Sequence, residues 1–331
     1  MKRALVVAIA LLVGAVEFQA QTVDQDDVIR VESELTNLPV TVTDKQRRFV
    51  TTLRAEDLRV LEDGVPQTLF TFQQETDRPL AIVFLIDVSA SQEVTLTDEK
   101  AAARLFIENV IKSNRDQVAV IPFTGSAYLE QDLTRDVLSV YRVLQGVEIA
   151  APGYLGSGRP LHGIPTGPRL PATPPEGSTA IWDAVALTSG NVLAKAIGQR
   201  RRAIILLTDG LDTTSRLSLK EAANRALAAE TVIYSIGIGN SKQEGVDRDP
   251  LRDVADRTGG RAFFPDKKFD LNAAFAEIER ELRTQYMIAY SSTNKKRDGA
   301  YRKITIEITN SELKKANLRL RHRPGYFAKS E

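Results

Sequence analysis

The segment from Leu80 to Asp87, LAIVFLID, consists of seven apolar residues followed by a carboxylate. A strand that is apolar at every position is buried on both faces, as in a parallel sheet covered by helices. Three similar apolar runs follow it in the chain, at Val118–Ile121, Ala203–Leu207 and Val232–Ile236. These four runs predict a central, mostly parallel sheet.

Helix-forming stretches lie between these runs. Residues 98–112 carry apolar side chains at helical spacing, and residues 180–197 and 218–230 are rich in Ala and Leu, which favour helices. Another helix is predicted at 270–283. Because strands alternate with helices, the fold class we predict is α/β and doubly wound, with helices on both faces of the sheet.

Shorter strands are predicted on either side of this region. In residues 21–78, apolar and polar residues alternate, and Asp63-Gly64 marks a tight hairpin turn. Residues 283–331 contain further short strands with the same alternation. Since neither segment is long enough to fold alone, we expect both to pack as a small β-sandwich-like module beside an α/β domain at 79–282.

Residues 1–20 have the pattern of a signal peptide. Lys2 and Arg3 precede an apolar run from Ala4 to Val16, which is short of the roughly 20 residues of a transmembrane helix. We expect cleavage after Ala20, with an uncleaved N-terminal anchor as the alternative. The protein is therefore expected to be secreted or periplasmic, with no membrane span in the mature chain.

The composition excludes several kinds of site. The 331 residues include 44 basic and 43 acidic ones, so the formal net charge is +1 and no strong field favours nucleic acid. There is no cysteine and there are only 2 histidines, which excludes disulfides, thiolate zinc sites and cysteine nucleophiles. A bound metal must sit mainly among oxygen ligands, as Mg²⁺, Ca²⁺ or Mn²⁺ does.

Oxygen-bearing side chains stand where these strands end. Ligands of doubly wound sheets bind at the carboxyl ends of the strands, and parallel strands bring those ends to one edge. Each of these residues alone is a common helix cap or turn residue. Together they offer two carboxylates and three hydroxyls, a donor set suited to a divalent cation. The predicted metal ligands are Asp87, Ser89, Ser91, Thr179 and Asp209.

This pattern resembles a known family. Asp87-x-Ser89-x-Ser91, Thr179 and Thr208-Asp209-Gly210 match the metal-ion-dependent adhesion site of von Willebrand factor type A domains. The resemblance covers roughly residues 79–282 and implies Mg²⁺, or Mn²⁺ or Ca²⁺, at the top of the sheet. It further implies that the three hydroxyls ligate directly or through water, that the two carboxylates supply charge, and that a partner's Glu or Asp completes the shell.

The flanking segments resemble a narrower group. Residues Val40–Asp44, Leu58–Gln67 and Arg323–Phe327 are similar to the bacterial secreted "VWFA-related" proteins abundant in Acidobacteria. That resemblance spans nearly the whole mature chain. It implies little about biochemical role, because this group is poorly defined functionally.

Three functions are compatible with this site. The first is a binding or adhesion protein that captures an acidic group of a protein partner through the metal. The second is a structural or assembly component of the cell envelope, in which the metal only stabilises the domain. The third, a metal-dependent hydrolase, is disfavoured because the chain lacks a phosphate-binding loop and a Gly-x-Ser-x-Gly elbow. We therefore expect no enzyme and assign no catalytic residue.

Four other features have open interpretations. Trp182 is expected in the core. Asp183 and Asp212 either orient ligand hydroxyls or are simply exposed. Arg200–Arg202 is expected in a solvated loop at the opposite end of the sheet. The Gly- and Pro-rich stretch at 151–178 either shapes or covers the metal site, or is a tolerated insertion.

Overall fold

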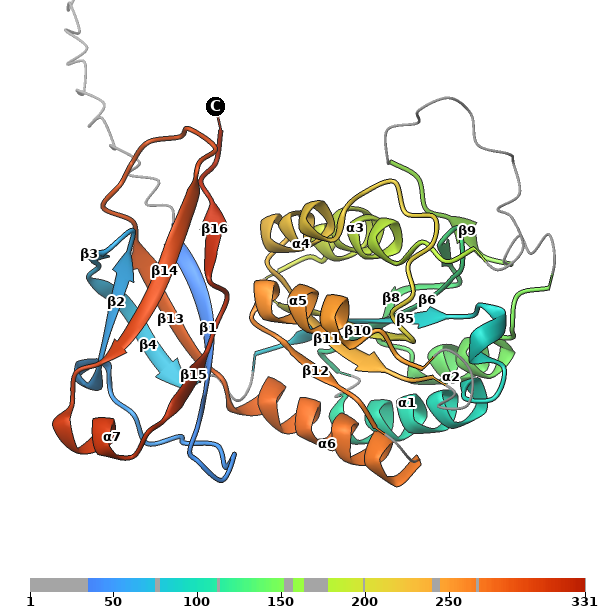
Figure 1. Cartoon of the computed structure of the whole chain (residues 1–331), viewed down its shortest axis with the longest axis horizontal. Helices are drawn as coiled ribbons and strands as arrows, with labels where there is room; N and C mark the ends of the chain where they lie inside the picture. Colours follow the sequence, from blue (N-terminus) through green and yellow to red (C-terminus); the bar gives the residue numbers. More distant parts are fainter. Residues whose placement is uncertain are drawn as a thin grey trace, which may run out of the picture. The chain divides into compact units, whose positions relative to one another are not determined.

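Six strands form one sheet in the computed structural model of the chain (Figure 1). They are β5 (Leu80–Asp87), β6 (Gln117–Phe123), β8 (Gln131–Thr134), β10 (Arg201–Thr208), β11 (Thr231–Gly237) and β12 (Arg261–Phe263). Their order is β12-β11-β10-β5-β6-β8, and every neighbouring pair is parallel except β6 and β8. The prediction of a mostly parallel sheet is confirmed.

The structure describes residues 35–74, 78–111, 114–151, 157–163, 178–198, 200–239, 245–265 and 268–330. All of them belong to one unit of the fold, Glu34–Glu331. The signal-peptide prediction at 1–20 and most of the stretch at 151–178 lie outside the described residues. Within that stretch β9 (Arg159–Pro160) is described, and it pairs with β7 (Tyr128–Leu129), which lies earlier in the chain.

Helices cover both faces of the sheet (Figure 1). They are α1 (Leu96–Val110), α2 (Val137–Gly146) and α6 (Lys268–Thr284) on one face, and α3 (Ile181–Asn191), α4 (Leu219–Ala228) and α5 (Arg248–Thr258) on the other. The doubly wound fold class is therefore confirmed. Within the described parts of the chain, no helix is both long and apolar enough to cross a membrane.

Strand β5 separates two hydrophobic cores. Ile82, Phe84 and Ile86 pack with α1 and α6, whereas the alternate residues, Val83 and Leu85 among them, pack with α3, α4 and α5. All eight residues of β5 are buried. This is why the strand has no polar position before its last residue.

Two of these helices are absent from the sequence prediction. Helix α2 begins at an N-cap, Asp136, whose carboxylate accepts hydrogen bonds from the backbone N–H groups of Leu138 and Ser139. Helix α5 ends at Gly259, whose φ of 83° is left-handed. Both helices are amphipathic, with Val140 and Leu144 of α2 and Leu251, Val254 and Ala255 of α5 buried at helical spacing. The signal for both was therefore present in the sequence, and the prediction did not use it.

Strands from both ends of the chain form two further antiparallel sheets. One has the order β15-β1-β13-β4 and the other β16-β14-β2-β3. Strand β1 pairs with β13, and β2 pairs with β14, so each sheet mixes the two flanking segments as predicted. The domain limits at 79 and 282 stay predictions. The bounds are Leu35–Thr43 (β1), Leu58–Glu62 (β2), Val65–Pro66 (β3), Leu69–Gln74 (β4), Tyr286–Ser291 (β13), Tyr301–Ile308 (β14), Arg319–Arg321 (β15) and Gly325–Phe327 (β16), with a short helix α7 at Ser311–Lys315.

The predicted hairpin turn forms at Asp63-Gly64. Both residues have positive φ, 49° and 82°, as a tight two-residue hairpin turn requires. The returning strand β3 is only two residues long, however, and β4 joins the other sheet by pairing with β13. The predicted turn therefore forms, but β4, the expected second strand of the hairpin, pairs with β13 and not with β2.

The buried centre of β10 provides a test of the fold. Replacing Ile205, which is fully buried, by Ala removes apolar contacts and leaves a cavity. We expect Ile205→Ala to lower the free energy of unfolding by about 2–5 kcal/mol. The exposed Val94→Ala should change it by less than about 0.5 kcal/mol. Urea denaturation followed by circular dichroism measures both, and equal effects would contradict the described core.

Candidate metal site at the carboxyl edge of the sheet

The carboxylate of Asp87 is held rigidly at the end of β5. It is fully buried. Its Oδ1 accepts a hydrogen bond of 2.9 Å from the backbone N–H of Ser89. Its Oδ2 accepts one of 2.6 Å from the hydroxyl of Thr208, the last residue of β10. Asp87 is therefore fixed by its own loop and by the neighbouring strand.

The two serines that follow Asp87 bring their hydroxyls together. The Oγ atoms of Ser89 and Ser91 are 3.0 Å apart. Ser89 is buried, whereas Ser91 is exposed, so the hydroxyl pair reaches from the interior to solvent. The fully buried Gln92 donates from Nε2 to Ser91 Oγ at 3.4 Å and accepts from Thr95 Oγ1 at 3.1 Å. Sequence reasoning missed Gln92, because nothing in the sequence marks its amide as buried.

Thr179 is held in place by the loop that follows β10. Its backbone N–H donates to Thr213 Oγ1 at 2.8 Å, and its carbonyl accepts from the N–H groups of Thr213 and Thr214 at 2.9 and 3.1 Å. The next residue, Ala180, donates to the carbonyl of Thr124, just after β6. Thr179 is 5% exposed and Asp209 is 4% exposed. Backbone and side-chain hydrogen bonds thus join the loops after β6 and β10 to the Thr179 segment.

Asp183 and Asp212 fix these loops through backbone groups. Asp212 Oδ1 accepts from the N–H of Ile181 at 2.7 Å and from Ser215 Oγ at 2.5 Å, so it caps the start of α3. Asp183 accepts from the backbone N–H groups of Arg216 and Leu217. Both carboxylates hold the Thr179 segment and the loop after β10 against each other. In the described structure their bonds run to backbone N–H groups and Ser215, and none runs to a ligand hydroxyl.

Trp182, the only tryptophan of the chain, packs in the core as predicted. It is 7% exposed and lies in the apolar cluster formed with α4 and α5.

Buried negative charge accumulates at this edge. Burial raises the pKa of Asp87 to about 6, and the charge of Asp209 adds to the rise, although hydrogen bonds from Thr208 and Ser89 oppose it. In α1, burial together with the charges of Asp87 and Asp209 raises the pKa of Glu99 to about 8. Glu99 is 1% exposed, and neither of its carboxylate oxygens has a hydrogen-bond partner.

The chemistry of these residues fits a divalent cation. The described partners of the Asp87 and Asp209 carboxylates are a hydroxyl and backbone N–H groups, and none of them is a cation. A positive ion beside them would offset the charges that raise the pKa values of Asp87 and Glu99. Among the residues that the structure describes, no three His, Cys, Asp or Glu side chains group as metal ligands. The candidate set depends instead on hydroxyls.

Several solved structures are similar to this chain. A von Willebrand factor type A structure from Catenulispora acidiphila has 16% identity and a TM-score of 0.49, and covers 77% of this chain and 51% of its own. Proximal thread matrix protein 1 from mussel byssus, "with zinc occupied MIDAS motif", has 16% identity and a TM-score of 0.49, with coverages of 67% and 49%. This chain thus spans about half of each of those two chains.

An aerotolerance-related membrane protein from Bacteroides fragilis, carrying multiple mutations to serines, is similar over a shorter part of this chain. Its identity is 17% and its TM-score is 0.45, with 61% of this chain and 98% of its own covered. No curated protein sequence matches the chain.

Two family models match the central part of the sequence. Both describe the von Willebrand factor type A domain, one over residues 82–211 and the other over residues 170–279. The first match includes all five predicted metal ligands, and the two overlap across Thr179 and Asp209. The chain therefore contains a von Willebrand factor type A domain.

Proposed function

We propose that the chain is an exported binding protein that engages an acidic group of a protein partner through a divalent metal ion. The observation that supports this most directly is that three segments meet at the carboxyl edge of the sheet: the loop after β5, the Thr179 segment and the loop after β10. Hydrogen bonds join the carboxylate of Asp87 to β10 and the backbone of Thr179 to the loop after β10. The residues that would hold the ion are Asp87, Ser89, Ser91, Thr179 and Asp209.

The residues have distinct tasks in this proposal. The hydroxyls of Ser89, Ser91 and Thr179 offer neutral oxygens, and Asp87 and Asp209 supply two negative charges. When bound, a divalent ion supplies positive charge and a coordination position for an outside oxygen. Because Ser91 is exposed while Asp87 is fully buried, a partner carboxylate would approach from the serine side.

Attraction for the partner would be local. The formal net charge of the chain is +1, so no long-range field of the whole protein steers an acidic ligand. The carboxylates are fixed by Thr208 and backbone N–H groups, which suits them to holding an ion in one geometry. We propose binding as the role of this site, with no catalytic residue.

Location and subfamily are parts of the same proposal. The signal-like pattern at 1–20 supports a secreted or periplasmic protein, retained at the membrane if the N-terminus is not cleaved. The flanking motifs at 40–44, 58–67 and 323–327 support membership of the bacterial secreted group that they resemble.

A second candidate function is structural. The two antiparallel sheets draw strands from both ends of the chain, and their exposed residues include Val65 and Phe70, at 51% and 75% exposure. In this alternative the sheets make the contacts of an envelope assembly, and the metal only stabilises the α/β domain.

Metal binding can be measured directly. Wild-type protein should bind Mg²⁺ or Mn²⁺ in a calorimetric titration, and Asp87→Asn and Asp209→Asn should abolish this binding. Thr208→Val, which removes the hydroxyl that orients Asp87, should weaken it by about 10- to 100-fold. Asp132→Asn removes an exposed carboxylate and serves as the matched control. The site assignment fails if wild type binds no more tightly than the Asp87 and Asp209 variants.

The buried acids make stability depend on pH. In metal-free protein the folded-state pKa values of Asp87 and Glu99, about 6 and about 8, exceed the ordinary 3.8 and 4.5. Between about pH 4 and pH 8 the folded state therefore binds more protons than the unfolded state, and its stability falls as the pH rises. We expect urea midpoints in EDTA to fall from pH 5 to pH 8, and Mg²⁺ to reduce this fall.

The neutral variant Glu99→Gln isolates the contribution of that side chain. Surface groups titrate alike in both proteins, so the decrease between pH 5 and pH 8 should be smaller in Glu99→Gln than in wild type. An identical pH dependence of the two midpoints would show that Glu99 is not a strained buried acid.

Partner capture separates the two candidate functions. Immobilised wild-type protein is incubated with envelope extract in Mg²⁺ or in EDTA, and circular dichroism verifies that it stays folded in both. Metal-dependent adhesion predicts that EDTA and Asp209→Asn release the same partners. Retention of those partners by folded protein in EDTA favours the structural role instead.

A further inference from the structure

One buried carboxylate near the metal site has no role in the set of predicted ligands. Glu99 lies in the first turn of α1, the helix that follows the loop of Ser89 and Ser91. It is 1% exposed, and neither of its oxygens has a hydrogen-bond partner among the described residues. A buried carboxylate is costly without a donor or a positive charge beside it. Glu99 therefore favours the arrival of a positive charge from outside the chain.

The polar groups closest to Glu99 in the sequence are bonded to other atoms. The hydroxyl of Thr95, one turn earlier, donates to the carbonyl and to the side-chain oxygen of Gln92, at 3.3 and 3.1 Å. The amino group of Lys100 donates to two backbone carbonyls at the end of α2, at 2.7 and 2.8 Å. Neither group is used to neutralise the glutamate.

The charges that act on Glu99 connect it to the metal site. Burial raises the pKa of Glu99 to about 8, and the negative charges of Asp87, Asp209 and Asp98 add to this rise, although Thr95 opposes it. Asp87 and Asp209 are the two carboxylates among the predicted metal ligands. Glu99 is thus within electrostatic range of both, while none of the described hydrogen bonds joins it to either of them.

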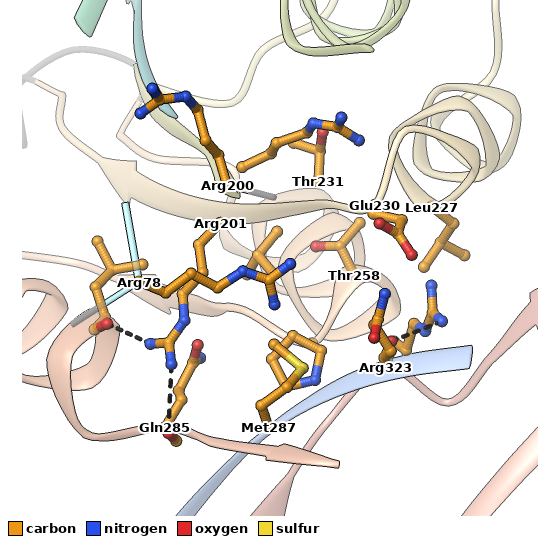
Figure 2. Close-up of a pocket in the computed structure, with 16 residues that line it drawn as sticks. Arg78, Arg200, Arg201, Leu227, Glu230, Thr231, Thr258, Gln285, Met287 and Arg323 are labelled. Carbon is orange, nitrogen blue, oxygen red and sulfur yellow. Dashed lines mark hydrogen bonds between the residues drawn. The ribbon is translucent and has the colours of Figure 1, made fainter. Parts of the chain in front are cut away.

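Buried charge at the opposite edge of the sheet is treated differently. The triplet Arg200–Arg202 is not the solvated loop that the sequence predicts, because β10 begins at Arg201, which is 7% exposed. Arg201 lines a small pocket at the amino edge and donates to the carbonyls of Leu282 and Gln285 (Figure 2). This buried cation has acceptors within the chain, whereas Glu99 has no donor among the described residues.

We propose that Glu99 is a third acid of the metal site, which strengthens the binding of a divalent ion through its charge and is not itself a ligand. This inference rests on the proposed function, since it requires an ion among the five predicted ligands. Without the ion, Asp87 and Asp209 repel the charge of Glu99 and so destabilise the fold. A divalent ion reverses the sign of that local field. The same side chain then favours the metal-bound protein.

The variant Glu99→Gln tests this, because it removes the charge and keeps the shape of the side chain. Measurements are made on the full chain at pH 8.5, above the pKa of about 8. In EDTA, the urea midpoint of Glu99→Gln should be higher than that of wild type. In calorimetry, its affinity for Mg²⁺ should be about tenfold weaker. A purely structural glutamate would not give these opposite signs, since its loss would lower stability.

Two further variants assign the effect to the buried charge. Asp98→Asn removes a carboxylate from the same turn of α1 that is only half-buried. Because solvent screens such a group, it should change the Mg²⁺ affinity by no more than about twofold. Glu99→Asp keeps the charge on a shorter side chain and should bind Mg²⁺ more tightly than Glu99→Gln.

The outcomes separate this inference from the proposed function. Wild-type protein that does not bind Mg²⁺ overturns the proposed function, and this inference with it. Wild type that binds Mg²⁺ no more tightly than Glu99→Gln overturns this inference alone. A Glu99→Gln protein that is less stable than wild type in EDTA, or that does not fold, also overturns this inference, because greater stability is expected.

Discussion

The parallel pairing of β5 with β10 is the constraint on which the rest of the structure depends. Seven consecutive residue pairs join these strands, from Arg201 opposite Leu80 to Leu207 opposite Ile86. This register places Thr208 beside Asp87, and the hydroxyl of Thr208 donates a hydrogen bond of 2.6 Å to the Asp87 carboxylate. The pairing of the two strands therefore sets the position of a candidate metal ligand. A shift by one residue would move Asp209 away from the Asp87 loop and turn core side chains to the wrong face.

Much of this arrangement is predictable from the sequence, because a strand buried on both faces has little choice of residues. The apolar runs at 80–86 and 203–207 therefore located the two central strands, and the order of the oxygen donors after them located the candidate site. Gln92 and Glu99 could not be located in the same way. Burial of a polar side chain depends on which elements pack over it, and a polar residue in a helix is normally exposed to solvent.

The two edges of the sheet carry opposite charge. Acids gather at the carboxyl edge around Asp87, and arginines gather at the amino edge around Arg201. At the carboxyl edge neither carboxylate oxygen of Glu99 has a hydrogen-bond partner, and at the amino edge Arg202 and Arg323 are among the arginines whose buried Nε has none. Buried ionic groups are costly without partners of opposite charge. At the carboxyl edge this cost is a physical reason to expect a cation, whereas the arginines of the amino edge donate to backbone carbonyls.

A crystal structure of the Mn²⁺-soaked protein, with anomalous diffraction collected at the manganese edge, tests the central claim most directly. The account predicts one strong anomalous peak within coordination distance of Ser89 Oγ, Ser91 Oγ and Thr179 Oγ1, with Asp87 and Asp209 close beside it. A peak elsewhere on the molecule, or none among these oxygens at saturating Mn²⁺, would contradict it.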